Sequence, residues 1–145
     1  MTSLLKIIGI FLILVAAIVA IHTVIEPLYY TSTDDNPYNA SVWTYINVLS
    51  AISIVLGIIL SYSRMSKVNE NSSVQEFIAA NTLFYGFMFV AIFFFWNWFG
   101  IQKFAEDFTA GGPETRSIVW IIVDALSPLL NGALGAHLLR KSDSS

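Results

Sequence analysis

The sequence contains no cysteine among its 145 residues. Without thiols the chain cannot form disulfides, ligate an iron–sulfur cluster or a thiolate zinc site, or attach a c-type haem. Its two histidines, His22 and His137, lie far apart and form no paired metal-binding motif. We therefore expect no metal and no cofactor, and thiol redox chemistry is excluded.

Charged residues are also scarce. Asp, Glu, Lys and Arg make up 12% of the chain, whereas hydrophobic residues make up 56%. Soluble domains carry about 25% charged residues, roughly twice as many. With seven Lys and Arg and a net charge of -3, the chain also lacks the basic surface that nucleic-acid binding requires. The charges lie between four long apolar stretches, a pattern typical of an integral membrane protein.

Each apolar stretch is about 20 residues long, which as a helix matches a hydrocarbon core of about 30 Å. Proline and capping residues mark the boundaries: Pro27 is predicted to end the first helix, Ser73 to cap the third and Pro113 to begin the fourth. We predict an all-α integral membrane protein, a single membrane domain over residues 1–145 with four transmembrane helices in an antiparallel bundle. The predicted spans cover about 7–25, 42–62, 77–96 and 118–139.

The first stretch has an alternative interpretation as a cleaved signal peptide. Lys6 precedes the apolar run, and Val15-Ala16-Ala17 resembles a cleavage site. The run continues to Ile25, however, which is long enough to cross the membrane. We therefore favour an uncleaved membrane anchor.

Basic residues predict the orientation, because Lys and Arg are retained on the cytoplasmic side of a membrane. Of the seven, only Lys103 and Arg116 fall on the side of the first and third loops. Both termini are therefore predicted to be cytoplasmic, in the cell membrane. Apolar residues at three- and four-residue spacing over about 98–108 predict a short interfacial helix on the outer side, interpreted as a connector, with a lid or docking surface as the alternative.

Asp124 is the acid that lies well inside a predicted span. A carboxylate in hydrocarbon costs roughly 2.5 to 3.5 kcal/mol on insertion scales, so it should face protein or water. Ser127, Pro128 and Asn131 share its helix face, and Pro128 has no N–H to donate to the Asp124 carbonyl. The favoured interpretation is a hydrogen bond to a neighbouring helix or to a partner subunit, which fixes helix packing. The alternative is a cation or proton site.

Four further polar residues are predicted in the same outer layer as Asp124, namely His22, Glu26, Asn47 and Asn97. His22 and Glu26 are four residues apart on one helix and can pair directly. We expect a hydrogen-bonded polar cluster; a divalent metal bound there is the weaker alternative.

Small residues predict where helices approach closely. They recur on the second span at Ser50, Ser53, Gly57 and Ser61, and on the fourth at Gly132 and Ala136. In lipid, such residues drive helix association, so these two helices are expected to face each other or a partner. The third span is apolar on every side, which predicts lipid contact or burial in a larger assembly.

Two functions remain open at this point. The favoured one is a small non-catalytic accessory or structural subunit of a larger multisubunit membrane complex, such as an oxidoreductase or transporter. The alternative is a homo-oligomeric ion- or proton-coupled small transporter or channel using Asp124. We find no nucleophile with a base, phosphate loop or cofactor motif, so no catalytic residue is assigned and an enzyme is not expected. The expected partners are the lipid bilayer and other integral membrane subunits, or further copies of the chain.

Overall fold

The computed structural model describes residues 2–33, 36–101 and 112–143. Over these ranges the chain forms helices and no strand. The helices are α1 (Thr2–Tyr29), α2 (Ala40–Met65), α3 (Val74–Gly100) and α4 (Pro113–Asp143). Each contains one predicted span, and all four are long and apolar enough to cross a membrane. These are the features of a multi-pass membrane protein.

The helix boundaries follow most of the predicted signals. Ser73 Oγ accepts a hydrogen bond from the Glu76 N–H at 3.1 Å, and α4 begins at Pro113. The prediction that Pro27 ends the first helix is wrong, because α1 continues through it to Tyr29. A proline removes one N–H donor, and this close to the helix end the last turn still closes: the Tyr30 N–H donates to the Glu26 carbonyl at 2.9 Å.

The predicted interfacial helix falls largely outside the described residues. Residues 102–111 belong to that part of the chain. Residues 98–100, which the prediction assigned to the interfacial helix, form the end of α3 instead.

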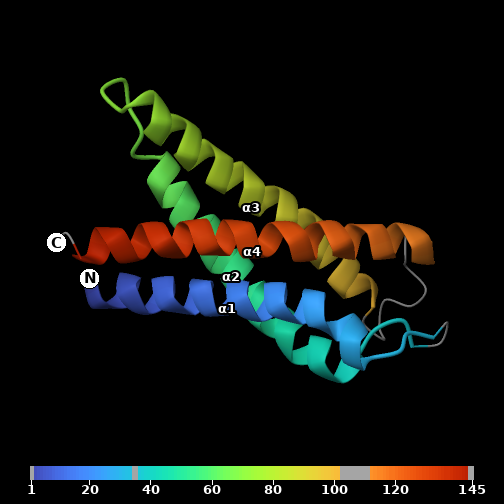
Figure 1. Ribbon diagram of the computed structural model, residues 1–145. Coiled ribbons are helices and arrows are strands. Elements are labelled where there is room, and N and C mark those ends of the chain that lie inside the picture. Colours follow the sequence, from blue (N-terminus) through green and yellow to red (C-terminus); the bar gives the residue numbers. More distant parts are fainter. Residues whose placement is uncertain (1, 34–35, 102–111, 144–145) are drawn as a thin grey trace.

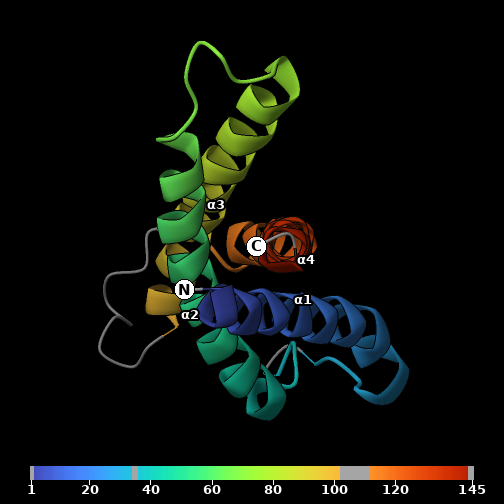
Figure 2. The same cartoon turned by 90° about the vertical axis from the view of Figure 1, so that its left-hand side faces the viewer.

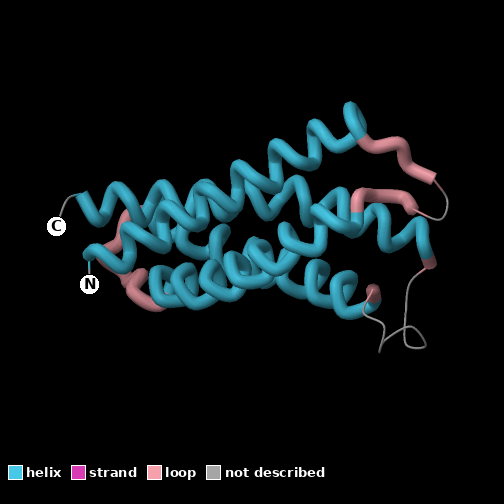
Figure 3. The backbone as a smooth tube through the Cα atoms, turned by 90° about the horizontal axis from the view of Figure 1, so that it is seen from below, coloured by secondary structure: helices cyan, strands magenta, loops and turns pink. Residues whose placement is uncertain are grey.

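The four helices are arranged as two pairs (Figure 1). α1 lies along α4, and α2 lies along α3. The second pair crosses the first, as the rotated view in Figure 2 makes clear. The connecting segments lie at the two ends of the helices (Figure 3). We call the end with residues 30–39 and the start of α4 the loop end, and the end where α1 begins and α4 finishes the terminal end.

Glycines permit the closest helix contacts. A Cβ on Gly135 of α4 would lie 2.8 Å from the carbonyl oxygen of Gly9 on α1, so these two backbones touch. A Cβ on Gly57 of α2 would lie 2.2 Å from the ring of Phe87 on α3. Gly57 therefore packs against α3. Around Gly132, in contrast, no atom of the described chain apart from its own helix turn lies within 4 Å of the corresponding position.

The core at the terminal end is mostly apolar, with the buried Ser61 as a polar member. All four helices contribute, α2 through the half-buried Ile58 and Leu60. Its buried members are Leu12, Leu83, Phe87, Leu134 and Leu138, which we call the leucine cluster. α3 buries Phe87 and Phe94 on one face while Tyr85 and Ile92 are exposed on another, so its uniformly apolar sequence serves both core and lipid-facing surface.

Candidate functional site

A cavity of about 380 Å³ lies at the loop end. Its walls come from α1, the 30–39 segment, α2, the residue following α3, and α4. Three residues that the sequence analysis placed in one layer, Glu26, Asn47 and Asp124, all line it. Its aromatic walls are formed by Tyr38, Trp43 and Trp120.

Glu26 is held in place by two hydrogen bonds. Its Oε1 accepts from the Asn39 N–H at 2.8 Å, and its Oε2 accepts from the Trp43 Nε1–H at 2.9 Å. These contacts fasten the end of α1 to the start of α2. Because both donors are neutral, the cavity wall retains a negative charge.

His22 lies behind this wall and is not among the lining residues. Its Nε2 is 3.1 Å from the hydroxyl of Tyr29, and its ring centroid is 4.9 Å from that of Trp43. The predicted pair of His22 and Glu26 is therefore replaced by an indirect link in which Trp43 contacts both. The buried Nδ1 of His22 has no hydrogen-bond partner in the described part of the chain.

Asp124 is half-buried and lines the cavity from α4. Among residues 2–33, 36–101 and 112–143, none donates a hydrogen bond to its carboxylate. The packing hydrogen bond predicted for Asp124 is thus not made within the described chain. Arg116, two turns earlier on α4, lines the same cavity, and its carbonyl accepts from Asn97 Nδ2 at 2.8 Å, which joins the start of α4 to α3.

Asn131 lies deeper, seven residues after Asp124 or about 10 Å along the helix. It is completely buried, and its Nδ2 lies 3.1 Å from Ser53 Oγ and 3.2 Å from Ser127 Oγ. Ser53 in turn donates to the Ser50 carbonyl at 2.8 Å. Here α2 and α4 meet through polar groups. The Asn131 Oδ1 receives no hydrogen bond from any described residue.

Beyond Asn131 the leucine cluster begins, and the side chains that meet between the helices are mostly apolar. Of the remaining residues singled out for packing, Ser61 donates to the Ile58 carbonyl of its own helix at 3.2 Å, and Ala136 is half-buried. We call the cavity together with the Asn131, Ser127 and Ser53 contact the polar path; the leucine cluster follows it toward the terminal end.

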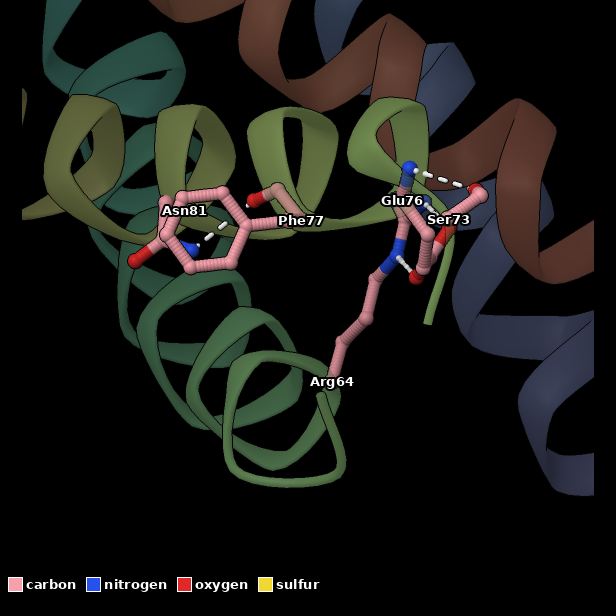
Figure 4. Close-up of polar contacts among 5 residues, drawn as sticks. All are labelled: Arg64, Ser73, Glu76, Phe77 and Asn81. Carbon is pink, nitrogen blue, oxygen red and sulfur yellow. Dashed lines mark hydrogen bonds and ion pairs between the residues drawn. The ribbon is translucent and has the colours of Figure 1, made fainter. Parts of the chain in front are cut away.

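The terminal end carries a different polar contact, an ion pair between α2 and α3 (Figure 4). Both Arg64 Nε and Nη2 donate to the Glu76 carboxylate at 2.7 Å. Sequence reasoning used Arg64 only for orientation and missed this pair. Their positions could have indicated it, because Arg64 is in the last turn of α2 and Glu76 is in the first turn of α3, on either side of a short loop.

The cavity is lined by charged and aromatic side chains but has no preformed metal cage among the described residues. The described residues contain no group of three or more His, Cys, Asp and Glu side chains that could hold a metal ion. Two carboxylates and one guanidinium face the cavity, so acids outnumber bases. Sequence reasoning missed Tyr38, Trp120 and Arg116, although Trp120 lies one turn before Asp124 on the same helix face.

Comparison with known proteins returns no match among protein-family models, curated proteins or solved structures.

Proposed function

We propose that the protein is a homo-oligomeric ion- or proton-coupled small transporter or channel of the cell membrane, with Asp124 as the group that holds the cation. The observation that supports this proposal is the cavity, which brings Asp124 and Glu26 together at one end of the helices. The sequence alone favoured an accessory subunit. The cavity makes us favour the transporter instead. A subunit whose role is only to pack against other subunits has no need of two carboxylates around an unfilled space.

The free-energy cost of placing the Asp124 carboxylate inside a membrane span supports the same proposal. A carboxylate inside a span is expensive unless it meets a partner or water, and such residues typically mark ion or proton pathways. The carboxylate accepts no hydrogen bond from the described residues and faces the cavity. A cation or proton entering the cavity would offset its charge.

Access from a single side is the second feature that supports transport. The leucine cluster lies between the polar path and the terminal end. The antiparallel topology that we propose, with both termini cytoplasmic, makes the loop end the outer face. Cations would then enter from outside, and release to the cytoplasm would require the leucine cluster to part.

Flux measurements test this function. We expect Asp124→Asn to abolish pH-dependent cation flux into proteoliposomes, because the amide cannot carry the charge, while the folded oligomer is retained. Glu114→Gln is the matched control: this exposed acid in the first turn of α4 does not line the cavity, and its removal should leave flux unchanged. Wild-type flux in a folded Asp124→Asn protein would contradict the proposal.

A non-catalytic accessory subunit of a larger membrane complex is the second candidate. It is favoured by the surface of α4 around Gly132, where nothing in the described chain approaches within 4 Å and the neighbouring Leu129 is 68% exposed. A small residue on an open helix face permits close approach of another helix. Purification in mild detergent separates the candidates: co-migrating membrane chains support the subunit, and a homo-oligomer alone supports the transporter.

A further inference from the structure

The walls of the cavity indicate which kind of cation it fits. We propose that the site binds an organic monocation with a substituted ammonium group, held between the aromatic walls and Asp124. This inference rests on the proposed function, since it takes Asp124 as the group that holds the transported cation.

Size is the first argument. Clefts of roughly 300 to 1,000 Å³ with apolar walls and a few polar groups are typical of sites for small organic molecules. At about 380 Å³ this cavity belongs to that class. A bare metal ion instead requires several oxygen ligands at about 2.0 to 2.6 Å. The described residues contain no cluster of three or more His, Cys, Asp or Glu side chains that could provide them.

The aromatic side chains are the second argument. Tyr38, Trp43 and Trp120 reach the cavity from the 30–39 segment, α2 and α4, so the rings lie on different walls. A substituted ammonium group is attracted to the faces of such rings, and it is apolar enough to displace water from them. An inorganic ion would gain little from these walls, because it keeps its own water.

Both indole rings are fixed in position before any ligand binds. Trp43 donates its Nε1–H to Glu26 and packs against His22. Trp120 contacts the buried Phe94 at 5.7 Å between ring centroids, nearly perpendicular. Rings that are already ordered lose little conformational entropy on binding, which favours affinity.

The charged residues of the cavity are the third argument, and they indicate the sign of the ligand's charge. Glu26 and Asp124 face the cavity with Arg116. Asp124 is the carboxylate with no hydrogen-bond donor among the described residues, so it is the one that a ligand cation would satisfy. A ligand carrying a carboxylate would instead select Arg116, and the experiment includes that outcome.

The test compares three probes that share a phenyl ring and differ in charge: benzyltrimethylammonium, benzyl alcohol and benzoate. Binding to the purified full-length protein in detergent is measured by calorimetry. We expect benzyltrimethylammonium to bind and benzoate not to bind. The affinity for benzyl alcohol should be lower than that for benzyltrimethylammonium by a factor of about ten or more. Benzoate or benzyl alcohol binding as tightly as the cation would overturn the proposal, and so would the absence of binding by all three.

Aromatic variants test the walls. Trp120→Leu should weaken benzyltrimethylammonium binding about tenfold, whereas Trp120→Phe should retain most of it because a ring remains. Trp96→Leu is the matched control, since Trp96 is a partly exposed tryptophan of α3 outside the cavity lining. If Trp120→Leu does not fold, Tyr38→Leu in the connecting segment replaces it. Equal affinity in a folded Leu variant and the wild type would contradict the assignment.

The two proposals fail separately. Flux lost in Asp124→Asn, together with no binding of any probe, would overturn the organic-cation inference and leave the proposed function standing. Benzyltrimethylammonium binding in a protein that shows no cation flux would support the site and contradict transport.

Discussion

The two ends of this molecule are built from the same four helices but differ in how their interiors are filled. At the terminal end, leucine and phenylalanine side chains fill the interior, and Gly9 and Gly135 bring two backbones into contact. At the loop end, aromatic and charged side chains surround a cavity of about 380 Å³. Close packing gains van der Waals contacts, so the terminal end is expected to hold the fold together. The loop end has apolar clusters of its own, around Phe94 and around Trp43, and in addition a cavity.

Overfilling the packed terminal end should have the largest effect on stability. Gly57→Ala places a methyl group into the ring of Phe87, a side chain with no exposed surface. Overpacking of this kind costs about 1 to 3 kcal/mol. We expect a clear drop in the thermal midpoint of the purified protein, followed by circular dichroism.

Gly132→Ala is the matched control on another helix. Its new methyl group meets nothing within 4 Å, and alanine favours helix over glycine by about 1 kcal/mol. Its thermal midpoint should be unchanged or higher. If Gly57→Ala and Gly132→Ala change the thermal midpoint by the same amount, α2 and α3 do not make the close contact at Gly57.

The ion pair at the terminal end should contribute less, although its geometry is bidentate. Glu76 is 41% exposed, and exposed ion pairs contribute about 0 to 1 kcal/mol. Glu76→Gln should therefore lower the thermal midpoint only slightly, with a smaller effect in high salt. Glu70→Gln, in the exposed loop between α2 and α3, should have no effect. A loss in Glu76→Gln as large as that in Gly57→Ala would show that the ion pair, and not apolar packing, dominates this end.

Apolar length and capping residues were enough to predict the helices. The four spans and the Ser73 cap were predicted because they depend on local sequence. Matching depths along the predicted helices also placed Glu26, Asn47 and Asp124 in one layer, and all three line the cavity.

Helix pairing could not be predicted in the same way. A span that is apolar all round gives no sign of which face packs inward, so the contact of Gly57 with Phe87 and that of Gly9 with Gly135 are properties of the assembled fold. The His22 side chain was expected to pair with Glu26 on its own helix. Trp43, which lies on a different helix, provides the indole N–H that Glu26 accepts and the ring that His22 contacts.

Transport as proposed requires that Asp124 is reached from the loop end and sealed from the terminal end. The chain contains no cysteine, so one introduced thiol is the sole target of a membrane-impermeant, cationic methanethiosulfonate reagent. We expect Asp124→Cys to react from the same side of the membrane as the loop reference Thr31→Cys, and Leu134→Cys to be protected from both sides. Reaction of Asp124→Cys only from the side that labels Glu70→Cys, or equal labelling of Leu134→Cys, would contradict the account.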